Sequence, residues 1–154
     1  MARWLDFLPS PNDLPAAGDP ARARLNFEHW DERVHRLDDA GLADFAREVA
    51  ADPGGKALLE AVFGNSPFLS DLIIDDIAGL RELLTRGPDA ALAEARDGMI
   101  EAAHTASDRN ACMAALRRAR RRNALGTALA DIAGQWSLDQ VTEALTAFAD
   151  AAVE

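Results

Sequence analysis

The sequence predicts an all-α fold, a single-domain bundle of about eight helices with an irregular N-terminal arm. Apolar residues recur at three- and four-residue steps along most of the chain, and alanine and leucine are abundant. There is no tyrosine and there are few runs of valine, isoleucine and threonine, so no segment alternates apolar and polar residues as a strand does. With 154 residues, 49% hydrophobic and 27% charged, the chain can bury a core and is not expected to be disordered.

An irregular arm is expected over residues 1–18, followed by one helical subdomain over residues 19–154. The arm contains four residues that interrupt regular structure, namely Pro9, Pro11, Pro15 and Gly18. The apolar side chains expected to anchor it to the body are Trp4, Phe7 and Leu8.

Each of the first three helices is predicted to begin after an aspartate, which can accept hydrogen bonds from the N–H groups of the first turn. These N-caps are Asp19, Asp39 and Asp52, and a proline at the first helical position follows two of them. The three predicted helices cover residues 20–37, 40–51 and 53–64.

A break between helices is predicted at Gly64, because glycine can close one helix while Ser66 caps the next and Pro67 opens it. The fourth helix is expected over residues 67–75, with Phe68 among its inward side chains.

The paired carboxylates Asp75 and Asp76 are interpreted as a helix boundary rather than a metal site. Adjacent residues on a helix point in different directions, and no Gly-Ser loop precedes the pair. Asp76 is expected to cap a fifth helix over residues 76–86, and Gly87-Pro88 to open a sixth over residues 88–105.

The last third of the chain predicts two more helices, over residues 108–133 and 138–154. Gly134 suits the left-handed position after a helix, and Ser137 with Gln140 has the spacing of a capping box. The final helix has no glycine, proline or basic last turn to end it. We therefore expect the sequence to be a piece of a longer protein.

Five arginines lie within residues 117–122 and form the most unusual feature of the sequence. At about 100° per residue, the apolar face through Leu125 and Leu129 extends backwards to Arg118 and Arg121. These two side chains are therefore expected to be partly buried and hydrogen-bonded to a neighbouring helix, with Arg120 in solvent.

Three interpretations of the arginine run remain open. The favoured one is pairing with acidic side chains of neighbouring helices, since the chain has 26 carboxylates. The next is a contact with an anion or a partner's acidic surface, for which Arg118, Arg121 and Arg122 are the candidates. Nucleic acid is the least favoured, because the net charge is −10.

No catalytic, cofactor-binding or metal-binding residue is predicted in this chain. It contains no nucleotide-binding loop and no catalytic triad, and its three histidines show no metal-ligand spacing. No apolar run approaches the roughly 18 to 20 residues that cross a bilayer. The start lacks a secretory signal and the single cysteine forms no internal disulfide, so the cytoplasm is the expected compartment.

Two segments resemble a known family. AVFGNSPFLSDLI includes the helix start at Gly64 to Leu69, and the C-terminal segment includes the arginine run, LADIAG at Leu129 to Gly134, and the helix from Val141 to Asp150. In this order they are similar to the N-terminal region of the bacterial bifunctional glutamine-synthetase adenylyltransferase/adenylyl-removing enzyme.

The resemblance implies that the chain is a helical, non-catalytic part of an enzyme that adenylylates a tyrosine of glutamine synthetase with ATP and removes AMP by phosphorolysis. Magnesium and ATP are implied for the full-length enzyme, whose nucleotidyltransferase domains supply the catalytic aspartates. The implied partners are glutamine synthetase, the PII signal protein and the rest of the same chain. No nucleic acid or membrane is expected. The alternative is a stand-alone helical module that binds an acidic partner through Arg117 to Arg122.

Overall fold

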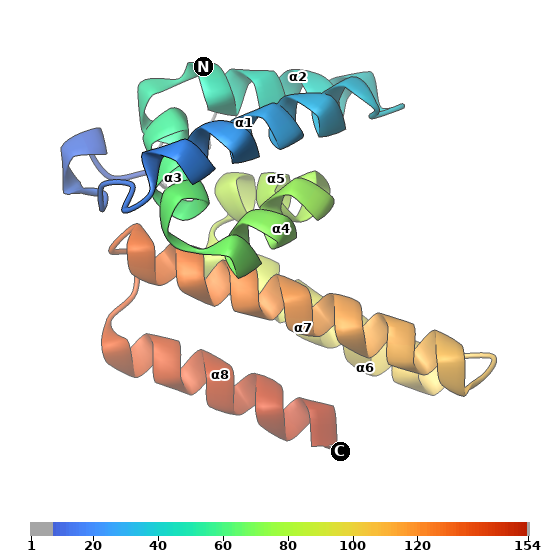
Figure 1. Cartoon of the computed structure of the whole chain (residues 1–154). Coiled ribbons are helices and arrows are strands. Elements are labelled where there is room, and N and C mark those ends of the chain that lie inside the picture. Colours follow the sequence, from blue (N-terminus) through green and yellow to red (C-terminus); the bar gives the residue numbers. More distant parts are fainter. Residues whose placement is uncertain (1–7, 154) are drawn as a thin grey trace. The chain divides into compact units, whose positions relative to one another are not determined.

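The computed structural model describes residues 8–153, and its regular elements are all helical (Figure 1). The prediction of an all-α fold is confirmed, and the predicted helices are found with boundaries shifted by no more than two residues. In chain order the elements are η2 (Pro11–Asp13), α1 (Pro20–His35), α2 (Ala40–Ala51), α3 (Pro53–Asn65), α4 (Pro67–Asp75), α5 (Ile77–Arg86), α6 (Pro88–Thr105), α7 (Arg109–Ile132) and α8 (Leu138–Val153).

The helix starts are fixed by the predicted side-chain caps. The carboxylates of Asp19, Asp39 and Asp52 each accept a hydrogen bond from the N–H group three residues on, and the hydroxyl of Ser66 does the same for Leu69. At the start of α8, Ser137 and Gln140 form the reciprocal bonds of a capping box. Because these signals are local, the boundaries could be predicted without knowing the tertiary packing.

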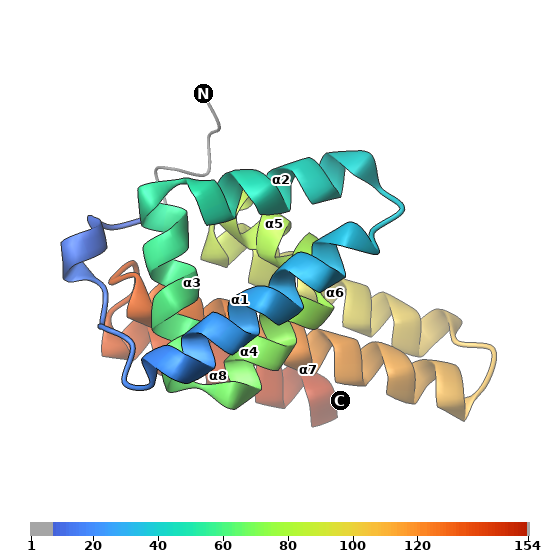
Figure 2. The ribbon, with the colours of Figure 1, turned by 45° about the horizontal axis from the view of Figure 1, so that its top comes forward.

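The chain divides into two compact units, Met1–Thr85 and Arg86–Glu154. The first unit is built around α3, which packs against α1, α2 and α4 (Figure 2). The aromatic rings of Phe63 and Phe27 meet edge to face at 5.1 Å, and Trp30 lies beside Phe63 at 6.3 Å. Trp30 and Phe63 are completely buried, so this aromatic cluster forms the centre of the unit.

The second unit is a helical hairpin with a third helix added. Helices α6 and α7 pack along each other, and α8 packs mainly on α7 with a smaller contact to α6. A Cβ atom added to Gly126 of α7 would lie 2.6 Å from a methyl carbon of Leu92 on α6, so the two helices approach closely there. α8 itself contains no fully buried residue.

The predicted arm over residues 1–18 is described only from residue 8 onwards. The described part contains the single turn η2, and Leu8 lies near Gly54 of α3. Trp4 and Phe7 lie outside the described residues. The assignment of residues 19–154 to one helical subdomain stays a prediction.

Two expectations about helix faces were wrong. Phe68 was expected to point inward, but it is 60% exposed. In α8, the helical spacing of Leu138, Val141, Leu145, Phe148 and Ala152 predicts one apolar face, yet only Val141 and Phe148 of these residues are half-buried and the others are exposed. In both cases the spacing of apolar residues correctly predicted a helix. It did not correctly predict which face of the helix is buried by its neighbours.

Candidate functional site on the arginine helix and the Gly64 junction

The junction between α3 and α4 ties the N-terminal arm to the body of the first unit. The side-chain amide of Asn65 donates to the carbonyl oxygens of Ala16 and Ala61, at 2.8 Å each, and its Oδ1 accepts from the N–H of Gly18 at 3.0 Å. One side chain therefore satisfies three backbone groups, two of which lie almost fifty residues earlier in the chain.

The carbonyl groups at the end of α3 are also satisfied by α1. The Gly64 oxygen accepts from the backbone N–H of Asp19 at 3.0 Å and from the Arg22 guanidinium at 2.7 Å. The Asn26 amide donates to the Phe63 oxygen at 3.1 Å and is buried. These bonds occupy the carbonyls that a helix end leaves free.

Gly64 is required at this junction because the arm passes directly over it. An added Cβ atom would clash with the Cβ of Ala17 and lie 2.8 Å from its Cα. The sequence identified Gly64 and Ser66 as a helix boundary but missed Asn65, whose partners are remote in sequence. The Gly-Asn-Ser-Pro segment is therefore a structural junction.

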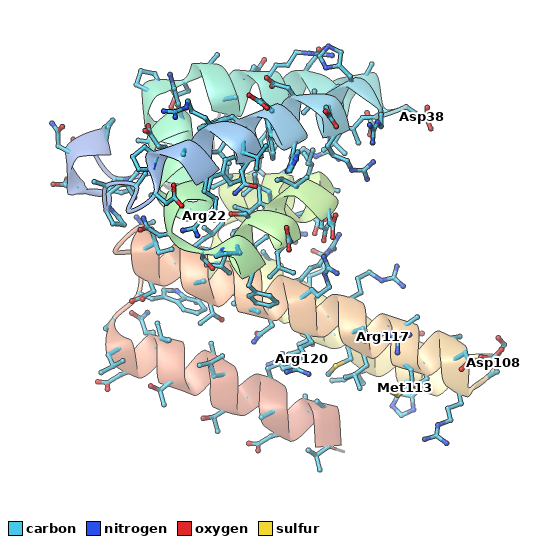
Figure 3. All side chains as sticks on the ribbon, in the orientation of Figure 1. Arg22, Asp38, Asp108, Met113, Arg117 and Arg120 are labelled. Carbon is cyan, nitrogen blue, oxygen red and sulfur yellow. The ribbon has the colours of Figure 1, made fainter. Side chains whose placement is uncertain are left out.

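The five arginines lie on α7, on which Figure 3 labels Arg117 and Arg120. Their predicted placement is only partly correct. Arg118 and Arg121 were expected to be partly buried, but both are exposed, as Arg117 and Arg120 are. The expectation for Arg120 was right, and that for Arg118 and Arg121 was wrong. Arg122 is half-buried.

The buried face of this part of α7 runs about one residue away from the predicted face. Ala119, Asn123 and Gly126 are buried, and Leu116 is half-buried. The prediction started from Leu125 and Leu129, which are buried in a part of α7 where most of the helix circumference is covered by neighbouring residues. Towards the N-terminus of α7, only a narrow strip of the helix surface is buried. The exposed arginines lie outside this strip. Small residues give a weak hydrophobic signal, so the sequence pattern did not reveal this face.

Elsewhere in the described chain, arginines form ion pairs with nearby carboxylates, for example Arg36 with Glu32 at 3.4 Å and Arg47 with Asp44 at 2.8 Å. Within residues 8–153, Arg117, Arg118 and Arg120 form no ion pair. Like charges three or four residues apart on a helix repel one another. This surface, formed by Arg117, Arg118 and Arg120, is called the arginine face below.

The described residues contain no group of side chains placed to hold a metal ion. No three histidine, cysteine, aspartate or glutamate side chains converge there. Asp76, from the Asp75-Asp76 pair, accepts a hydrogen bond from the N–H of Gly79 at 2.9 Å, as an N-cap does. Among the described helices, none is long and apolar enough to cross a membrane.

These features define a helical region whose described part contains a structural junction and an exposed basic face. The family model described as glutamate-ammonia ligase adenylyltransferase matches residues 56–154. The chain belongs to this family, as its resemblance at Gly64 to Leu69 and along α7 and α8 predicted.

Curated relatives extend the similarity to most of the chain. The bifunctional glutamine synthetase adenylyltransferase/adenylyl-removing enzyme of Rhodopseudomonas palustris strain HaA2 is 39% identical over 132 residues, covering 80% of this chain and 13% of the relative. The enzyme of the same name from Bradyrhizobium diazoefficiens is 33% identical over 152 residues, covering 96% of this chain and 14% of the relative.

The Xanthobacter autotrophicus enzyme of this name is 33% identical over 141 residues, covering 92% of this chain and 14% of the relative. The chain therefore spans about one seventh of the length of these relatives. No solved structure matches it.

Proposed function

We propose that this chain acts as the N-terminal helical part of an adenylyltransferase/adenylyl-removing enzyme and that its own role is structural. The observation that carries the proposal is how much of each chain the alignments cover. The relatives align with 80% to 96% of this chain, whereas the chain covers only 13% to 14% of them. Most of the polypeptide of such an enzyme is thus available to carry its chemistry elsewhere.

In the proposed enzyme, ATP-dependent adenylylation and phosphorolytic removal of AMP control glutamine synthetase. Both reactions need preorganised carboxylates that hold Mg²⁺ against phosphate oxygens. The convergent carboxylates this requires are not found among residues 8–153. We propose that ATP and magnesium bind to other parts of the enzyme.

The proposed role of the helices is to support the adenylyl-removing domain and to offer a surface to partners. The partners proposed are the rest of the same chain, glutamine synthetase and the PII signal protein, and the proposed compartment is the cytoplasm. The first unit suits such a support, because its aromatic core and junction bonds hold α1, α2, α3, α4 and the arm together.

A chimaera tests this proposal. In the Rhodopseudomonas palustris relative, the segment that matches this chain is deleted or replaced by this chain, and phosphate-dependent ADP release from adenylylated glutamine synthetase is measured. The deletion is expected to abolish release and the chimaera to restore it, while the isolated 154-residue chain shows neither ADP release nor AMP transfer. Turnover by the isolated chain, or full activity of the deletion, would refute the proposal.

A second candidate function is a helical interaction module that binds an acidic partner through Arg117 to Arg122. The exposure of four of these arginines favours it. The test compares the triple variant Arg117→Glu, Arg118→Glu and Arg120→Glu with the control triple variant Arg24→Glu, Arg36→Glu and Arg47→Glu, which changes the net charge equally. Labelled poly-L-glutamate should bind the wild type and the control. If the arginine-face variant binds as well, this candidate is wrong.

A further inference from the structure

A groove lies in the second unit, at the end of the hairpin where a short loop joins α6 to α7. Its volume is about 460 Å³. Its walls come from the last two turns of α6, the first two turns of α7 and the last turn of α8, and they include Ile100, Ala103, Cys112, Leu116, Ala151 and Ala152. Apart from the thiol of Cys112 and the imidazole of His104, the lining is apolar. The groove therefore suits apolar side chains better than an ion.

The groove lies where α8 leaves the hairpin uncovered. α7 has 24 residues and the described α8 has 16, so at 1.5 Å per residue they are about 36 Å and about 24 Å long. The end of α7 and the start of α8 lie side by side, because only the turn at Gly134 and the capping box at Ser137 separate them. About two turns of the hairpin thus extend past the last described turn of α8, and Figures 1 and 2 both show this.

The residues through which α8 packs lead into this groove. Val141, Ala144, Phe148 and Ala151 are half-buried and recur at three- and four-residue steps, whereas the other described residues of α8 are exposed. Ala151 belongs both to this stripe and to the wall of the groove. A helix that continued α8 would place its next stripe positions, four and seven residues after Ala151, against the uncovered turns of α6 and α7.

We propose that this groove binds about two further helical turns that continue α8 in the longer enzyme, with apolar side chains four and seven residues after Ala151. This inference rests on the proposed function, in which further polypeptide follows the region described here, since the chain covers only 13% to 14% of its relatives. A segment attached to α8 is present beside the groove at a high effective concentration. It is therefore favoured over a second copy or another protein as the occupant.

The thiol of Cys112 reports whether the groove is covered, because it is the single cysteine of the chain and lines the groove in a half-buried position. The 154-residue chain is compared with an extended chain. The extension consists of the next five helical turns, about 18 residues, that follow the matching segment in the Bradyrhizobium diazoefficiens relative, with any cysteine replaced by serine. The control extension has the same residues in scrambled order.

Each protein is mixed with an aromatic disulfide reagent, which forms a mixed disulfide with the Cys112 thiolate and releases a coloured thiolate. We expect Cys112 to react at least about tenfold more slowly in the extended chain than in the 154-residue chain, because the reagent reaches the thiol only when the added turns open. The scrambled extension should leave the rate unchanged. Equal rates with and without the native extension, or equal protection by the scrambled one, would overturn the proposal.

Two variants of the extended chain test whether the protection arises in the groove. Ile100→Asp places a carboxylate in the groove and should return the reaction rate to that of the 154-residue chain. Leu25→Asp, at an exposed apolar position on α1 in the first unit, is the matched control and should keep the protection. Protection that survives Ile100→Asp would contradict the proposal.

The protein concentration distinguishes the attached segment from a second copy. Protection by the attached segment should be the same at every concentration, whereas protection that increases with concentration would show that a second copy covers the groove and would overturn the proposal. Failure here is distinct from failure of the proposed function. The chimaera can restore ADP release even if Cys112 stays fully reactive in the extended chain.

Discussion

The two units of this chain differ in the packing inside each of them. Of the largest fully buried side chains in the described chain, all but Leu129 belong to the first unit, including Trp30, Phe63 and Ile73. The second unit relies on close approach of small residues, as at Gly126, and its α8 buries no residue fully. The comparison indicates that the first unit has the more self-sufficient core.

Polar contacts differ in the same way. In the first unit, Asn65 and Arg22 bond to backbone groups more than forty residues away. In the second unit, the side chains of Thr105, Thr142 and Thr146 bond to carbonyl oxygens four residues earlier, and the ion pair of Arg86 with Glu94 joins residues eight apart. Long-range bonds resist local opening, whereas short-range bonds stabilise only their own helix.

The largest expected effect comes from matched truncations of phenylalanine in the two units. Phe63→Ala removes a completely buried ring that contacts two other aromatic rings and should cost about 3 to 5 kcal/mol of unfolding free energy. Phe148→Ala, at a half-buried position on α8, should cost about 1 kcal/mol. Urea unfolding of both variants measures the difference, and equal losses would contradict the comparison.

Two glycine substitutions, one in each unit, should change the stability in opposite directions. Gly64→Ala forces a methyl group against the backbone of Ala17 and should destabilise the protein by about 1 to 3 kcal/mol. Gly98→Ala, in α6, meets open space and should stabilise it by about 0.5 to 1 kcal/mol through helix propensity. Thermal melts of both variants test this, and a stabilising Gly64→Ala would show that the arm does not hold its position over α3.

Removal of the Asn65 side chain should loosen the arm. Asn65→Ala leaves the Ala16 and Ala61 oxygens and the Gly18 N–H without this partner and should cost about 1 to 2 kcal/mol. Asn110→Ala, at an exposed position in α7, is the matched control and should change stability by less than about 0.5 kcal/mol. Limited proteolysis at the arm should be faster in the first variant alone; equal cleavage rates would contradict this role.

The smallest effect is expected on the arginine face. Arg118→Ala and Arg120→Ala should each change the unfolding free energy by less than about 0.5 kcal/mol, because both side chains are exposed. If Arg118→Ala alone lowered the unfolding free energy by more than about 1 kcal/mol, the result would support the partly buried position of Arg118 that the sequence predicted. Denaturant unfolding of the two variants side by side provides this test.

The features that sequence reasoning found are those fixed by local chemistry. Caps such as Asp19 and Ser66 act within three residues, so the helix boundaries could be read from the sequence. The Asn65 contacts with Ala16 and Gly18 depend on the tertiary path of the arm and leave no local signal.

The helix faces were harder to predict because burial depends on the neighbours that cover a helix. The periodicity of α7 was correct, yet Ala119 and Gly126, not Arg118 and Arg121, continue its buried face. The burial of Asn123 on α7 was missed for the same reason, because a single polar residue among alanines gives no periodic signal.

Amide hydrogen exchange, read along the whole chain by mass spectrometry, tests the contrast between the two units most directly. We expect the amides of α1 and α3 to exchange slowest, and those of α8 to exchange at least about tenfold faster, because α8 opens without disrupting a buried aromatic core. Protection of α8 equal to that of α3 would contradict the account, since it would mean that both units open only when the whole protein unfolds.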